Sequence, residues 1–89
     1  MNKKYKCVCC GNYTMENEDP LYYDICPVCY WENDPIQNDD PMYEGGANGI
    51  SLLKAKENFV KYGAVKLRFK EYAVSYEEFI KKIKKENNE

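Results

Sequence analysis

Two short cysteine turns decide the fold of this chain: Cys7-Val8-Cys9-Cys10-Gly11 and Cys26-Pro27-Val28-Cys29-Tyr30. Fifteen residues separate the two Cys-x-x-Cys pairs, a spacing typical of four-cysteine zinc sites. Each turn directs both sulfurs to one side, so two facing turns can close a tetrahedron around one ion. Glycine after the first pair and proline within the second suit tight turns, although Tyr30 stands where glycine would be easier. The sequence therefore predicts one structural zinc ion held by Cys7, Cys10, Cys26 and Cys29.

Other interpretations of the cysteine pairs can be compared with the zinc site. An iron site of rubredoxin type uses the same ligands, and the sequence does not separate the two metals. A thioredoxin-like redox pair would begin a helix in a βαβ unit, and no such unit surrounds either pair. Repeated pairing also disfavours cysteines that are buried only as apolar side chains. A catalytic zinc would need an open position, and four thiolates leave none. We therefore expect a structural site.

Cys9 is the fifth cysteine and is not needed for the predicted site. One interpretation is a bystander thiol that partly faces solvent. The other is a thiolate that the neighbouring metal keeps reactive, or a position sensitive to oxidation.

Length and cysteine count indicate the class of protein. A chain of 89 residues forms one domain, 1–89, and such a small core often needs a metal or disulfides for stability. An odd number of cysteines fits a closed disulfide framework poorly. The first residues lack the apolar core of a signal peptide, and no stretch approaches the roughly 18 apolar residues of a membrane helix. We expect a cytoplasmic protein without membrane contact.

The predicted class is α+β, with a zinc-ribbon-like β-hairpin framework packed against one or two helices. Residues 5–31 form the metal turns, with strands expected at 4–6 and 22–25. Residues 32–49 have no sustained periodicity, which predicts a long acidic loop containing glycines. A helix is expected over 50–63, where Ser51 caps its start and Gly63 ends it. Alternation over 64–73 suggests a strand, and the capping box of Ser75 and Glu78 predicts a helix over 75–86.

The charges divide along the chain. Residues 1–50 carry three Lys and nine Asp or Glu, whereas residues 51–89 carry ten Lys or Arg and six Asp or Glu. In the 32–49 loop, Asp34, Asp39 and Asp40 are candidates for a surface that binds a basic partner. We therefore expect a protein-interaction module. The alternatives are a nucleic-acid-binding ribbon using the basic C-terminal half, a rubredoxin-like iron electron carrier, and a small hydrolase using loop carboxylates, for which no acid/base pair or nucleophile stands out.

A family resemblance covers about residues 5–64. The two cysteine turns, Trp31-Glu32-Asn33-Asp34-Pro35, Gly45-Gly46-Ala47-Asn48, Ser51-Leu52, Asn58-Phe59 and Gly63-Ala64 together resemble the bacterial cysteine-rich family named for its Cys-Pro-Cys-Cys motif. The sequence departs from that motif at Val8, which replaces the proline and removes no ligand. The resemblance implies a small metal-binding fold and leaves the biochemical function open.

Overall fold

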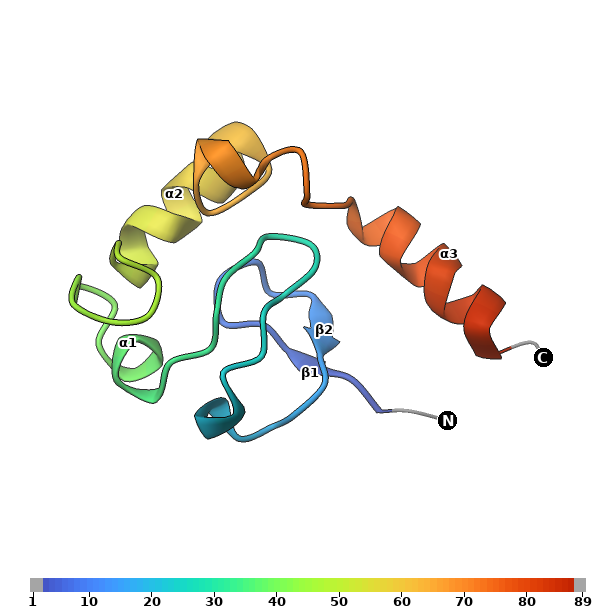
Figure 1. The fold of residues 1–89 in the computed structure, drawn as a ribbon, viewed down its shortest axis with the longest axis horizontal. Coiled ribbons are helices and arrows are strands. Elements are labelled where there is room, and N and C mark those ends of the chain that lie inside the picture. The colour runs from blue at the N-terminus through green and yellow to red at the C-terminus, as the bar shows by residue number, and fades with distance from the viewer. Residues whose placement is uncertain (1–2, 88–89) are drawn as a thin grey trace.

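The computed structural model describes residues 3–87 and has the predicted α+β class, with a two-stranded antiparallel hairpin and three α-helices (Figure 1). The ends of the predicted domain 1–89, residues 1–2 and 88–89, lie outside the described residues. Within this range, no helix is both long and apolar enough to cross a membrane. The elements, with 3-10 helices labelled η, are β1 (Tyr5–Lys6), β2 (Tyr13–Met15), η1 (Pro20–Tyr22), α1 (Pro35–Asp39), α2 (Leu52–Tyr62), η2 (Leu67–Phe69) and α3 (Tyr76–Asn87).

The hairpin joins the start of the chain to the segment after the first cysteine pair. Tyr5 lies opposite Met15 and Lys6 opposite Tyr13, with an irregularity in register between the two pairs. Met15 is buried and contributes to the core. The strand expected over residues 4–6 is therefore present as β1, and its partner β2 was not predicted.

The strand predicted over residues 22–25 is wrong. Asp19 accepts a hydrogen bond from the Leu21 N–H, and Pro20 has the backbone angle of a helical turn, so η1 forms instead. Tyr23 then takes a left-handed conformation with φ of 53°. Within residues 22–25, Ile25 forms an isolated antiparallel bridge with Glu32.

The predicted 32–49 loop contains a short helix, α1, that begins at a strong cap. The Asp34 carboxylate accepts hydrogen bonds from the backbone N–H groups of Ile36 and Gln37, and Ala47 donates a further one from the far end of the segment. Burial opposes ionisation of Asp34, but these three donors lower its pKa below the usual value. Because the folded pKa is lowered, this carboxylate stabilises the fold above about pH 4, the unfolded value, and the contribution is lost as the pH falls through the folded pKa.

A buried amide network folds the rest of this segment around α1. The Gln37 side chain is fully buried and donates to the carbonyl oxygens of Tyr43 and Ile50. Its own oxygen accepts from the backbone and side-chain amides of Asn48. Asn48 also pairs with both backbone groups of Glu32, at 2.8 Å each. The segment therefore lacks hydrophobic periodicity because polar side chains organise it.

Helix α2 forms where it was predicted, inside residues 50–63. Ser51 accepts from the Lys54 N–H, and Gly63 ends the helix with φ of 83°. Leu52 and Ala55 face the core, whereas Val60 is 87% exposed.

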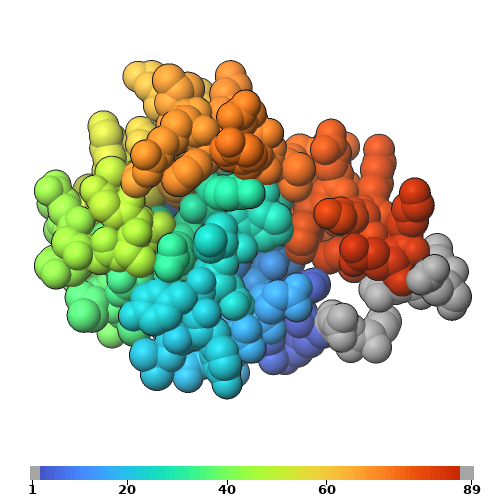
Figure 2. Space-filling view, in the orientation of Figure 1, coloured from blue at the N-terminus to red at the C-terminus, as the bar shows by residue number. Residues whose placement is uncertain are grey.

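The strand predicted over residues 64–73 is wrong, because the segment attaches by single hydrogen bonds and then turns into η2. The Val65 N–H donates to the Cys29 carbonyl, and the Val74 N–H donates to the Pro27 carbonyl. Helix α3 follows and differs from the predicted 75–86 by one residue at each end, with Ser75 accepting from the Glu78 N–H. Figures 1 and 2 show α3 beside the hairpin at one end of the molecule, where Phe79 is buried.

Gly46 gives a test of the buried network. A methyl group at Gly46 would meet the Gln37 side chain and lie 2.6 Å from Asp34 Oδ2. We predict that Gly46→Ala lowers the free energy of unfolding by about 2–3 kcal/mol, as overpacking does. The control is Gly63→Ala, which meets nothing within 4 Å and costs only the strain of its positive φ, about 1 kcal/mol. Chemical denaturation of both variants measures the difference, and equal losses would contradict this account of the network.

Candidate metal centre

The two cysteine turns, here called the first knuckle (residues 7–12) and the second knuckle (residues 26–31), have the same backbone. In each, the carbonyl of the first cysteine accepts from the N–H four residues later, at 2.9 Å in the first knuckle and 2.8 Å in the second. The N–H of the same cysteine donates to the carbonyl five residues later, at 2.9 Å in both. Two turns of equal shape therefore face each other across the site.

The residue after the second cysteine of each knuckle is left-handed. Gly11 has φ of 79°, which glycine adopts without strain, and Tyr30 has φ of 71°. For tyrosine this conformation costs roughly 1–2 kcal/mol. The Tyr30 ring packs against Phe69 and Tyr72, with ring centroids 5.5 and 6.1 Å away, and these contacts offset the strain. Tyr30, at the position where glycine would be easier, thus attaches the second knuckle to the C-terminal half of the chain.

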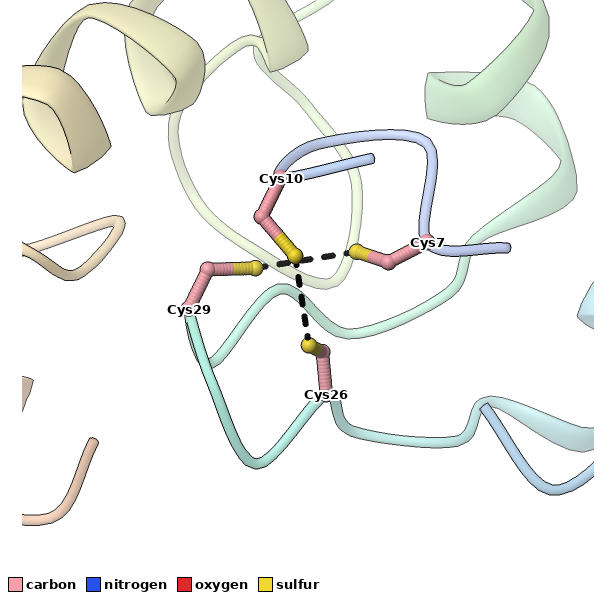
Figure 3. A group of neighbouring side chains, drawn as sticks. All are labelled: Cys7, Cys10, Cys26 and Cys29. Atoms are coloured by element: carbon pink, nitrogen blue, oxygen red, sulfur yellow. Dashed lines mark hydrogen bonds between the residues drawn. The ribbon is translucent and has the colours of Figure 1, made fainter. Parts of the chain in front are cut away.

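The four predicted ligand sulfurs converge (Figure 3). Cys7 Sγ and Cys29 Sγ lie 3.6 Å apart, Cys10 Sγ and Cys26 Sγ lie 3.7 Å apart, and all four atoms lie within 4.8 Å of one another. Four thiolates placed tetrahedrally at about 2.3 Å from one ion would be separated by about 3.8 Å. The sulfur positions therefore fit a metal ion bound by one cysteine pair from each knuckle.

Hydrogen bonds orient the sulfurs from outside the cluster. Thr14 Oγ1 lies 2.9 Å from Cys26 Sγ, so a Cys26 thiolate accepts a hydrogen bond from this buried hydroxyl. The Trp31 N–H points at Cys29 Sγ from 3.4 Å. Hydrogen-bond donors of this kind fix the orientation of the ligands and adjust the affinity of the site for its metal. The Thr14 contact was not predicted, because Thr14 reaches the site only through the unpredicted strand β2.

Hydrogen bonds between the sulfurs shift the pKa values of two of the cysteines in opposite directions. The pKa of Cys26 is lowered because Cys10 and then Cys29 donate hydrogen bonds to its sulfur. The pKa of Cys29 is raised because its thiol donates to Cys10 and Cys26. A bound divalent cation would stabilise all four thiolates together, and the chemistry of the donor set therefore fits a metal ion.

Cys9 lies in the core beside the first knuckle. Its side chain is 8% exposed, so the expectation of a bystander thiol that partly faces solvent is wrong. The first knuckle turns Cys7 and Cys10 toward the site. Of the two residues between them, Val8 is exposed and Cys9 packs with the buried hydrophobic residues. All five cysteines are free thiols.

The three acidic residues predicted as a partner surface do not share one environment. Asp34 is 6% exposed and its carboxylate is held by backbone N–H groups, so it does not belong to an accessible surface. Asp39 and Asp40 are exposed at the end of α1. The cap that buries Asp34 has a sequence signal, an Asp followed by Pro at the first helical position.

Two cysteine variants, one at a predicted ligand and one at the fifth cysteine, test the site. Cys26→Ser removes one ligand, and we predict that the purified protein loses stoichiometric metal. Cys9→Ala removes a buried thiol outside the cluster, and it should keep one metal ion per chain. Native mass spectrometry counts the ions. Loss of metal in Cys9→Ala with retention in Cys26→Ser would overturn the ligand assignment.

Comparison with known proteins agrees with this site. The family model described as Cysteine-rich CPCC matches residues 5–88. This range extends the resemblance, noted over residues 5–64, through α3. No curated protein sequence matches the chain. The match spans nearly all of the chain and includes all five cysteines. The chain therefore belongs to the cysteine-rich CPCC family.

Proposed function

We propose that the protein is a structural zinc domain that acts as a protein-interaction module. The convergence of four thiolate ligands supports the zinc assignment, because closed four-cysteine sites are typical of structural zinc. Such a site leaves no position for a water molecule, and we assign no catalytic role to the metal. Rubredoxin-type iron uses the same ligands and is the competing assignment.

The metal can be identified in protein purified without added metal. We predict one zinc ion per chain by native mass spectrometry and no absorption in the visible range, since Zn²⁺ has a filled d shell. A red-brown protein containing iron would contradict the zinc assignment and would favour electron transfer.

The observation that favours a protein partner is an exposed apolar surface formed by η1 and α1, which contact each other. Leu21 and Tyr22 on η1 are 65% and 67% exposed, and Ile36 on α1 is 62% exposed. Large apolar side chains that gather on one exposed face are typical of interaction sites. Figure 1 shows α1 and, next to it, the short η1 turn along the lower edge of the molecule, with α2 above them.

Acidic groups accompany these apolar side chains. Asp19 caps η1, and Asp39 and Asp40 end α1; all three are exposed. We call the set of Asp19, Leu21, Tyr22, Ile36, Asp39 and Asp40 the η1–α1 surface. Its chemistry suits a protein segment that carries apolar side chains next to Lys or Arg, because opposite charge speeds encounter and orients the partner. The same negative charge opposes nucleic-acid binding here, and that alternative would use the exposed lysines of α3.

Site-specific photocrosslinking tests the interaction. A photoreactive residue in place of Tyr22 should capture one protein in the native cells, and the same residue in place of Val60, on the outer face of α2, should not. The captured protein is then purified and its affinity measured. We predict that Ile36→Asp weakens binding at least tenfold, because it puts a charge in the apolar contact, a loss of about 1.4 kcal/mol.

Val60→Asp is the matched control, since it changes an 87% exposed aliphatic residue on another helix. The control should leave affinity unchanged. Equal affinity of Ile36→Asp and the unaltered protein would show that the η1–α1 surface does not bind this partner.

A further inference from the structure

Two cations of the C-terminal half converge on one aromatic ring beside the second knuckle. Lys66 Nζ lies 5.7 Å from the Phe69 ring centroid, and the Arg68 guanidinium carbon lies 4.9 Å from it. Neither cation forms an ion pair with any residue between 3 and 86. Burial and the nearby Arg68 charge lower the pKa of Lys66. An anion between the two cations would relieve this unfavourable arrangement.

A cavity lies beside this pair. It has a volume of about 200 Å³ and is lined by Lys66, Arg68 and Phe69. The other lining residues lie in or next to the second knuckle and in the α1–α2 segment: Ile25, Tyr30, Glu32, Ala47 and Asn48. Pockets that enclose drug-sized ligands measure roughly 300–1,000 Å³. This cavity is smaller and suits a single small group. Figure 2 shows η2 (orange) next to the residues of the second knuckle (turquoise) on the visible face.

The backbone on both sides of the cavity is held in place. Val65 immediately precedes Lys66, and its N–H donates to the Cys29 carbonyl. The Phe69 N–H donates to the Lys66 carbonyl. On the opposite wall, Asn48 is fixed by its paired hydrogen bonds to Glu32. Preorganised cations lose less entropy on binding an anion than flexible surface lysines do. Lys66 is half-buried, whereas Arg68 is exposed and lies against the Phe69 ring.

We propose that Lys66 and Arg68 bind a phosphomonoester group in this cavity. The charge of a monoester, close to −2 at neutral pH, matches two cations, and Arg binds phosphate oxygens with two parallel hydrogen bonds. Glu32 lines the same cavity and repels an anion, so it limits the affinity of the site. The site shares no residue with the η1–α1 surface and does not depend on the proposed protein interaction.

An NMR titration of the metal-loaded protein with inorganic phosphate tests the proposal. We predict saturable shifts of the Asn48 and Phe69 amides, and about tenfold weaker binding for Lys66→Met and for Arg68→Ala, because each removes a charge-assisted contact. Lys70→Ala is the matched control: it removes an exposed cation of the same segment that does not line the cavity, and it should leave the dissociation constant unchanged.

Glu32→Gln distinguishes the cavity from general surface attraction. Removing this carboxylate should tighten phosphate binding several-fold if the anion sits beside it. Phosphoserine should bind at the same amides, and acetate should bind more weakly. Equal effects of Arg68→Ala and Lys70→Ala, or no effect of Glu32→Gln, would overturn the site. Tighter binding of an oligonucleotide without a terminal phosphate would assign these cations to nucleic acid and contradict the monoester proposal.

Discussion

Four sulfur atoms from two separate turns have to occupy one small volume, and the rest of the structure is arranged around that constraint. Four thiolate charges at this spacing, with two sulfur pairs 3.6 and 3.7 Å apart, repel one another, so the fully ionised cluster is unfavourable unless a cation occupies its centre. Hydrophobic burial offers limited compensation, because the core of this small chain includes the cysteines themselves. A metal ion would therefore both neutralise the cluster and cross-link the two knuckles.

The second knuckle connects this centre to α1 and to the segments that lead into η2 and α3. Trp31 is fully buried and its indole N–H donates to Asn38 in α1. The Cys29 carbonyl holds Val65 ahead of η2, and the Pro27 carbonyl holds Val74 ahead of α3. Each bond starts from a residue within or next to the metal turn. The η1–α1 surface and the Lys66–Arg68 cavity consequently depend on one knuckle for their positions.

The sequence was sufficient for features that depend on local chemistry. Paired spacing identified the four sulfurs, and the cap residues Ser51, Gly63 and Ser75 located two helices, because each signal acts within a few residues. Prediction failed where distant contacts decide the conformation. Residues 64–73 alternate like a strand, yet no neighbouring strand is available and Val65 attaches to the second knuckle by one backbone bond. The fold of residues 32–49 depends on Gln37 and Asn48, whose amides have partners 6 to 16 residues away and no periodic signal. The burial of Asp34 and Cys9 could not be foreseen for the same reason.

The central claim is that a metal ion at the four cysteines holds the knuckles together. The most direct test compares the unfolding transition of two preparations of the reduced protein. One has its metal bound, and a chelator has removed all of the metal from the other. We expect the metal-free protein to lose its cooperative transition, and restored metal to recover it, because binding free energy at such sites is folding free energy. An unchanged unfolding transition in metal-free protein would contradict the account.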